Sequence, residues 1–223
     1  MNTIESTIQS IEQFQNASLI KIFKSKKNTV CLIELNQSAY VLKLFSNENI
    51  SGFQNELMIL FKSNTMYNKA QMKSFDEKNK YILLEYVKGE NVCDFINNPS
   101  IPYKKKTSII QELARWFNQF HDDLCDNNLT LIHGDANLRN FLYTNIIIGL
   151  DFEETINGKP SQDIANICAS ILTTNPQFTK EKEELKDLFI QSYQKLSSND
   201  LSTISEEIEK TIQKIKKRRK KRN

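Results

Sequence analysis

The chain has 223 residues and a mass of 26.0 kDa, with 39% hydrophobic residues, 26% charged residues and a formal net charge of +3, which is typical of one soluble domain or two joined lobes. No apolar run approaches the roughly 18 residues of a membrane span, and the first ten residues lack the pattern of a signal peptide, so we expect a cytoplasmic protein. The four cysteines (Cys31, Cys93, Cys125 and Cys168) are far apart without a C-x-x-C pair, which argues against zinc or a disulfide framework and predicts buried, reduced thiols.

The positive charge is concentrated at the C-terminal end. Residues 214–223 (KIKKRRKKRN) hold eight basic residues and no acidic one, so that the other 213 residues hold 22 basic against 27 acidic residues. Such a block attracts polyanions, either nucleic acid or an anionic membrane surface, although a solvated end that binds nothing specific is the simpler alternative. The residues to which we assign RNA or polyanion binding are Lys216, Lys217, Arg218, Arg219, Lys220, Lys221 and Arg222.

The first third of the chain is predicted to consist mainly of strands. Residues 29–35 and 39–45 are rich in β-branched and aromatic side chains and are separated by the turn-forming residues 36–38, which indicates an antiparallel pair. Apolar residues at three- and four-residue spacing predict a helix over 50–61, and residues 80–87 (KYILLEYV) predict a further strand.

The pattern becomes mainly helical after Gly89. Apolar spacing predicts a long amphipathic helix around 109–120 and another around 163–172. Short strands are expected between them, within 131–143 and 146–152. Two more helices complete the chain, and the last carries an apolar stripe from Leu201 to Ile215. The basic block is therefore expected to continue from a packed helix.

Residues 133–154 (HGDANLRNFLYTNIIIGLDFEE) carry a pattern of phosphoryl transfer. Asp135 and Asn140 are spaced as in a catalytic loop H-x-D-x-x-x-x-N, and Asp151 follows an apolar strand. Asp135 would orient an acceptor hydroxyl and take its proton. Asn140 and Asp151 would offer hard oxygen ligands to a divalent metal beside the phosphates.

Two upstream residues complete the pattern. Lys43 alternates with Val41 along a predicted strand, so the two share a face. Val41 is expected to lie against the adenine of ATP and Lys43 to reach its α- and β-phosphates. Glu56 lies 13 residues after Lys43 in the predicted helix and is expected to form an ion pair with it.

The order Lys43, Glu56, Asp135, Asn140, Asp151 resembles the protein-kinase-like superfamily over roughly residues 19–172. The HGD triplet is similar to that of aminoglycoside phosphotransferases, RIO kinases, the kinase subunit of the tRNA-threonylcarbamoylation complex and lipopolysaccharide-core kinases.

The resemblance implies an α+β fold of two lobes: an antiparallel-sheet N-lobe with one main helix (1–88), a minimal helical C-lobe (89–213) and a basic tail (214–223). It also implies an ATP-dependent kinase that uses Mg²⁺ or Mn²⁺. Residues 84–87 resemble a kinase hinge, in which the Glu85 carbonyl and the Val87 amide would bind adenine, and Leu142 resembles the residue beneath the base.

The sequence departs from protein kinases in three places. No G-x-G-x-x-G exists, and residues 24–28 (KSKKN) occupy that turn, so lysine side chains are expected to share phosphate binding with backbone amides. Glu153 stands where D-F-G has its glycine, and no A-P-E segment follows. Arg139 has the spacing seen in tyrosine-kinase loops and would either steady the transferred phosphate or act as a salt-bridge partner.

Two further polar residues have structural interpretations. His133 is expected to anchor the loop through hydrogen bonds, because proton acceptance there belongs to the aspartate. Asp163, at the start of a predicted helix, would either cap that helix or fasten the backbone of the catalytic loop.

The acceptor must be inferred from the size of the C-lobe and from the basic tail. Only 45 residues separate Val87 from His133, which leaves little room for the inserted helices that enclose small acceptors in aminoglycoside and choline phosphotransferases. Together with the basic tail this favours a macromolecular acceptor. The chain weakly resembles the archaeal RIO-like tRNA kinase family, which implies transfer to a ribose 2′-hydroxyl of tRNA or other structured RNA.

Three alternatives stay open. One is a serine/threonine protein kinase or an ATPase subunit of a tRNA-modification complex. Another is a lipopolysaccharide-core sugar kinase or other small-molecule kinase. The third is a pseudokinase that only binds. Intact Lys43, Asp135, Asn140 and Asp151 argue against the last. Oligomeric state is not predicted.

Overall fold

The computed structural model describes residues 4–62, 65–126 and 129–221. These residues form two compact units. The first, here called the N-lobe, contains residues 4–62 and 70–88. The second, the C-lobe, contains residues 65–69 and 89–221.

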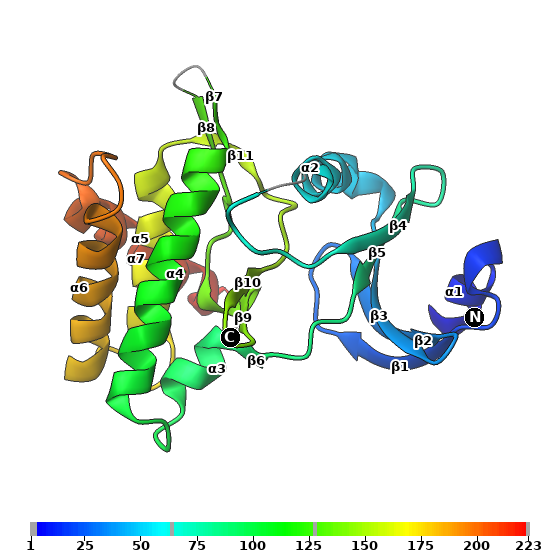
Figure 1. Ribbon diagram of the computed structural model, residues 1–223, viewed down its shortest axis with the longest axis horizontal. Coiled ribbons are helices and arrows are strands. Elements are labelled where there is room, and N and C mark those ends of the chain that lie inside the picture. The colour runs from blue at the N-terminus through cyan, green and yellow to red at the C-terminus, as the bar shows by residue number, and fades with distance from the viewer. Residues whose placement is uncertain (1–3, 63–64, 127–128, 222–223) are drawn as a thin grey trace. The chain divides into compact units, whose positions relative to one another are not determined.

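The N-lobe is built on one five-stranded antiparallel sheet with the strand order β1-β2-β3-β5-β4 (Figure 1). Its strands are β1 (Ser18–Phe23), β2 (Thr29–Leu35), β3 (Ser38–Leu44), β4 (Met72–Asp76) and β5 (Tyr81–Glu85). The predicted hairpin is present: β2 and β3 are joined by Asn36 and Gln37, whose φ angles are +52° and +64°. Two consecutive left-handed residues give the tight turn that suits twisted strands.

Helical segments pack against both faces of this sheet. On one face, the short helix α1 (Ile4–Gln9) and the 3₁₀ helix Glu12–Phe14 pack through Ile8 and Phe14 onto buried residues of β2, β3 and β5. Neighbouring strand residues point to the opposite face, where α2 (Ile50–Phe61) follows the 3₁₀ helix Asn47–Asn49. The helix predicted over 50–61 is therefore confirmed, whereas α1 was not predicted.

The C-lobe is mainly helical, as predicted (Figure 1). Its helices are α3 (Val92–Asn97), α4 (Tyr103–Asp123), α5 (Pro160–Thr173), α6 (Lys180–Gln194) and α7 (Ile204–Lys220). Helix α6 packs against α4 and α5, and α7 packs against α5. The apolar stripe of α7 is buried at Ile204 and Ile208 and half-buried at Ile212 and Ile215.

Two small sheets carry the loops of the C-lobe. One has the order β10-β9-β6 and the other β11-β8-β7. The strands are β6 (Glu90–Asn91), β7 (Cys125–Asp126), β8 (Leu129–Ile132), β9 (Phe141–Tyr143), β10 (Ile147–Gly149) and β11 (Ile156–Gly158), with a 3₁₀ helix at Leu138–Asn140. The strands expected within 131–143 and 146–152 are present but shorter than those ranges.

An aromatic cluster forms the core beneath these loops. Trp116 of α4 is 2% exposed, stacks on Phe120 and contacts Phe141 edge to face. Its Nε1 donates to the carbonyl oxygen of Asn68 at 2.7 Å. Gly149 lies against the indole, where an added Cβ would come within 2.3 Å of a ring carbon. Residues 141 and 149 of the segment 133–154 therefore pack against this buried apolar cluster.

The cysteine prediction is correct for three residues and wrong for one. All four thiols are free, and Cys31, Cys93 and Cys168 are buried, but Cys125 is exposed. It lies on β7, a two-residue strand at the edge of its sheet whose side chains both face solvent. Among the described residues, no helix combines the length and apolar character required to cross a bilayer.

Candidate active site

The N-lobe brings the predicted lysine and glutamate together. Lys43 lies on β3 between Val30 of β2 and Ile82 of β5, and its Nζ lies 2.5 Å from Oε2 of Glu56 on α2. Both residues are buried, with exposures of 5% and 1%. Because both charges are removed from water, loss of either would leave the other poorly compensated.

The other nucleotide residues predicted in the N-lobe lie at the matching ends of two paired strands. Val41 is half-buried on β3 and lies opposite Leu84 of β5. Glu85 is the last residue of β5, and its carboxylate lies 2.9 Å from Nζ of Lys73. Val87 follows as a half-buried residue outside the sheet. This placement leaves the roles assigned to the three residues as predictions.

The loop between β1 and β2 is held by side chains. Oδ1 of Asn28 accepts hydrogen bonds from the backbone N–H of Ser46 at 3.4 Å and from Nδ2 of Asn49 at 3.2 Å. These bonds tie the loop to the segment that leads into α2. Lys24, Lys26 and Lys27 of this loop are exposed, which places three positive charges at the turn between β1 and β2.

In the C-lobe, Asp163 of α5 fastens the catalytic loop. This residue is fully buried, and its carboxylate accepts from the backbone N–H groups of His133 at 2.7 Å and Gly134 at 3.1 Å. Nε2 of His121 donates to the same carboxylate at 3.1 Å. Of the two roles predicted for Asp163, the structure therefore shows the fastening of the loop.

His121 also has a second buried partner. Its Nδ1 lies 2.8 Å from the hydroxyl oxygen of Tyr193. Burial raises the pKa of Tyr193 to about 12, so this hydroxyl keeps its proton. The histidine thus connects α4, α5 and α6 beneath the loop.

Asp135 and Asn140 are joined within the loop. Nδ2 of Asn140 donates to the backbone carbonyl of Asp135 at 2.8 Å. Asn137 donates to the same carbonyl at 3.0 Å and to a carboxylate oxygen of Asp135 at 3.3 Å. The Asp135 residue is exposed, and the hydrogen bond from Asn137 orients its carboxylate.

Asp151 is connected to this loop through the residue before it. Leu150 donates its N–H to the carbonyl of Asn140 at 2.9 Å, and its own carbonyl accepts from Nε2 of His133 at 3.0 Å. Asp151 has a φ of +64°, which is unusual for a residue other than glycine. Strained backbone of this kind often occurs at functional sites. The anchoring role predicted for His133 agrees with this geometry.

The donor set of the C-lobe suits a divalent cation. Asn140 directs its Nδ2 at the loop, which leaves Oδ1 as the atom that a cation would take. The half-buried Asp151 offers a carboxylate. Carboxylate and amide oxygens are the ligands that Mg²⁺ prefers in proteins, so the residues present fit this metal.

Arg139 and Leu142 flank the loop. Nη1 of Arg139 lies 3.6 Å from Oδ1 of Asp94, and both side chains are about two-thirds exposed. Exposed pairs of this kind contribute little stability, so the arginine can exchange this partner for a phosphate. Leu142 is half-buried on β9, where it pairs with Ile148 of β10 and Asn91 of β6.

The predicted polyanion-binding residues lie on a helix. Helix α7 contains Lys216, Lys217, Arg218, Arg219 and Lys220, and Lys221 forms its C-cap. Arg222 lies outside the described residues. Nη2 of Arg219 donates to the carbonyl of Thr173 at the end of α5, 2.9 Å away. One of the assigned charges therefore has a structural partner, and the block is ordered as a helix through Lys220.

Two residues that position the loop were missed by the sequence analysis. The hydroxyl of Ser170 on α5 accepts from the N–H of Leu138 at 3.1 Å. Oδ1 of Asn137 accepts from the N–H of Arg139 at 3.0 Å and caps the 3₁₀ helix. Asn137 could have been predicted, because an asparagine side chain commonly accepts from the backbone N–H two residues later. Ser170 had none, since 32 residues separate it from its partner.

Comparison with known proteins agrees with this geometry. Residues 102–198, just under half of the chain, match the model of APH, the phosphotransferase enzyme family. A curated relative in Dictyostelium discoideum, a bifunctional serine/threonine-protein kinase/NEDD4-like E3 ubiquitin-protein ligase, is 24% identical over 164 residues. The match covers 70% of this chain and 9% of the relative. The chain thus spans about a tenth of the length of that relative.

Solved structures share the fold at low sequence identity. The gentamicin complex of APH(2″)-IIa has a TM-score of 0.64 at 14% identity, covering 95% of this chain and 86% of the other. A ternary complex of a thermostable mutant of aminoglycoside phosphotransferase APH(4)-Ia with AMP-PNP and hygromycin B has a TM-score of 0.60 at 13% identity. It covers 88% of this chain and 85% of the other.

The fold and the family match agree with each other. The chain has the α+β fold of the aminoglycoside phosphotransferase structures, with a sheet-based N-lobe and a helical C-lobe. The match to the phosphotransferase family model falls on the C-lobe, which carries Asp135, Asn140 and Asp151. Both findings support the predicted phosphotransferase of the kinase type.

Proposed function

We propose that the protein transfers the γ-phosphate of ATP to a hydroxyl group with the help of Mg²⁺ or Mn²⁺. The observation that carries this proposal is the hydrogen-bonded unit of Asp135 and Asn140, with Asp151 connected to it through Leu150. The buried pair of Lys43 and Glu56 supports it. A similar fold was solved with the ATP analogue AMP-PNP.

In the proposed reaction the acceptor oxygen forms a bond to the γ-phosphorus while the bond to the bridging oxygen of ADP breaks. Asp135 orients the hydroxyl and takes its proton, since its carboxylate is open to an acceptor. Lys43 binds the α- and β-phosphates and is held by Glu56. Bound at Asn140 and Asp151, a divalent metal would neutralise phosphate charge.

The remaining assignments concern adenine and the transferred group. The Glu85 carbonyl and Val87 amide bind the adenine edge, and Val41 contacts the base. Leu142 takes the role of the residue beneath the base that its resemblance implies. Arg139 steadies the transferred phosphate after leaving Asp94. Its exposed, weakly held position supports this role.

For the acceptor we propose structured RNA, with transfer to a ribose 2′-hydroxyl of tRNA or a similar molecule. The exposed Asp135 suits a macromolecular acceptor. Helix α7 supports the choice of polyanion, because it presents five consecutive basic residues from Lys216 to Lys220 in an ordered helix. A duplex bound through about six charges would lose affinity with salt at a slope near −5 in logarithmic terms.

A small molecule is the second candidate acceptor. The family match and the two solved structures favour it, since both structures are aminoglycoside phosphotransferases. The chain also covers 85–86% of those proteins. The part of their structure that is missing here is therefore smaller than the short connection between Val87 and His133 indicated. The HGD loop is common to both candidates, so the catalytic residues do not separate them.

The deciding experiment offers labelled ATP and Mg²⁺ with total tRNA, a generic protein and an aminoglycoside in parallel. Asp135→Ala and Asp151→Ala should each reduce transfer by at least about 100-fold. Asp122→Ala, which changes an exposed aspartate of α4, is the matched control and should transfer normally. Label in tRNA supports the RNA acceptor, and label in the aminoglycoside or the protein refutes it. Asp135→Ala activity within a few-fold of wild type would show the catalytic assignment to be wrong.

A further inference from the structure

Phe178 is an aromatic side chain that the phosphotransferase chemistry leaves unexplained. It lies in the connection between α5 and α6 and is 43% exposed. Its φ is +52°, a left-handed conformation that is costly for a bulky residue. An exposed aromatic ring at a strained backbone position is a candidate binding residue.

Hydrogen bonds attach the segment around Phe178 to α5, α6 and α7. The N–H of Phe178 donates to the carbonyl of Leu172 at 2.9 Å. Lys182 of α6 donates to the carbonyl and the hydroxyl of Thr174. Arg219 of α7 binds Thr173. The ring is therefore presented by an ordered segment that is attached to α7.

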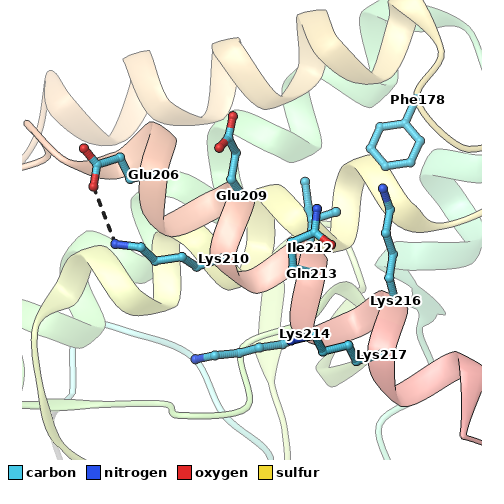
Figure 2. A pocket seen from close by; sticks show the side chains of 9 residues that line it. All are labelled: Phe178, Glu206, Glu209, Lys210, Ile212, Gln213, Lys214, Lys216 and Lys217. Carbon is cyan, nitrogen blue, oxygen red and sulfur yellow. Dashed lines mark hydrogen bonds and ion pairs between the residues drawn. The ribbon is translucent and has the colours of Figure 1, made fainter.

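One lysine side chain of α7 lies beside the ring, and two more lie on the same part of the helix. Nζ of Lys216 lies 5.6 Å from the centre of the Phe178 ring, within the range of a cation–π contact. Lys214 and Lys217 lie on the same part of α7, as Figure 2 shows. Phe178 and the three lysines line one part of a surface hollow of about 760 Å³, which is also lined by Glu206, Glu209, Lys210, Ile212 and Gln213.

The charge of this surface changes along α7. At the end nearer the start of the helix, Glu206 pairs with Lys210 at 3.5 Å. From Lys210 to Lys220 the helix contains no acidic residue. Glu206 and Glu209 line the hollow toward the start of α7, whereas its charged residues nearest the C-terminal end of the helix are all lysines, so this end favours a ligand with negative charge.

We propose that Phe178 and the lysines beside it form a binding site for an unpaired nucleotide of RNA, with the base stacked on Phe178 and the backbone phosphates bound by Lys214, Lys216 and Lys217. The proposal rests on the RNA acceptor proposed above. It extends recognition from the basic end of the chain to a residue nearly 40 positions earlier. An aromatic face beside cations is the usual means of binding single-stranded nucleic acid.

The chemistry favours RNA over other anions. An acidic peptide would satisfy the lysines without making use of a flat ring. A membrane surface would require several apolar side chains at one level, whereas Phe178 has Lys216 beside its ring. A nucleotide supplies negative charge and a flat stacking partner in adjacent positions.

The test measures binding of the full-length protein to a fluorescein-labelled, unstructured RNA of about ten nucleotides by fluorescence anisotropy. Stacking is worth enough that Phe178→Ala and Phe178→Leu should each weaken binding at least about fivefold. Phe178→Trp, which keeps an aromatic face, should bind within about twofold of wild type. Phe61→Ala removes an exposed ring of the N-lobe and is the matched control.

The charge contribution is tested by salt. Lys214→Gln should reduce the slope of log affinity against log salt by about 0.7, the share of one phosphate contact on a single strand. Lys78→Gln, an exposed lysine of the N-lobe, should leave the slope unchanged. Phe178→Leu should lower affinity without altering the slope. This separates the base contact from the phosphate contacts.

Each contrary result has one meaning. Equal affinity of wild type and Phe178→Leu for RNA would overturn the site, even if total tRNA is phosphorylated. Loss of binding to vesicles of anionic lipid in Phe178→Leu, with RNA binding intact, would assign the surface to a membrane and also overturn it. Phosphate transfer to an aminoglycoside alone, together with weakened RNA binding in Phe178→Leu, would refute the proposed acceptor and leave the site established.

Discussion

Asp163 provides a quantitative test of how the catalytic loop is held. Replacing it with alanine removes the acceptor of the backbone N–H groups of His133 and Gly134 and of Nε2 of His121. A buried donor left without an acceptor costs about 1–3 kcal/mol. With partial relaxation the three donors would cost roughly 3–6 kcal/mol, which is a large share of the 5–15 kcal/mol or so that stabilises a domain.

Asp163→Asn is the finer variant, because it keeps the shape but turns an NH₂ group toward one of the donors. We expect it to lower the free energy of unfolding by about 1–3 kcal/mol. Trp116 is the single tryptophan and is buried in the C-lobe, so its fluorescence in a urea titration reports this lobe. Asp187→Asn on α6, with a side chain 58% exposed, is the control and should change stability by less than about 0.5 kcal/mol. If Asp163→Asn is as stable and as active as that control, Asp163 does not hold the loop.

Three more substitutions have distinct expected results. Gly134→Ala places a Cβ 2.1 Å from the carbonyl oxygen of Glu154 at a φ of +79°, so the same titration should show a loss of at least about 2 kcal/mol; an unchanged midpoint would contradict the geometry. Glu56→Gln leaves the buried Lys43 without its charged partner and should destabilise the N-lobe by about 3 kcal/mol, seen as faster amide exchange in α2 while the tryptophan signal is unaffected. Burial lowers the pKa of Lys182 to about 8; the unfolded chain therefore binds more protons between pH 8 and about 10.4. Wild type should gain stability relative to Lys182→Met as pH rises through that window, and a constant difference would show that this lysine keeps its ordinary pKa.

Much of the fold could be predicted from local patterns. Strand β2 lies at the predicted residues, and α2 and α5 follow the apolar spacing of the sequence. The short helix α1 could not be predicted in this way, because six residues form a marginal helix on their own. It exists because Ile8 packs onto a sheet whose strands come later in the chain.

In the candidate site, too, local sequence patterns predicted some features, and tertiary packing determined the others. The spacing of Asp135 and Asn140 and the distance from Lys43 to Glu56 are sequence features, and each pair does meet in the structure. The contact of Ser170 with the loop depends on how α5 packs, and no local pattern encodes it. The residues proposed to react could therefore be predicted from the sequence, whereas a residue that positions their loop could not.

Asp135 and Asn140 lie in one loop, and Asp151 lies in a second segment that follows β10. The bonds that connect the three residues involve backbone groups of Asp135, Asn140 and Leu150. Asp163 and His133 fix the ends of that path without facing an acceptor. Because a displacement of about 1 Å in a catalytic group can cost 100-fold in rate, the buried carboxylate of α5 should influence transfer almost as strongly as the residues that touch the substrate.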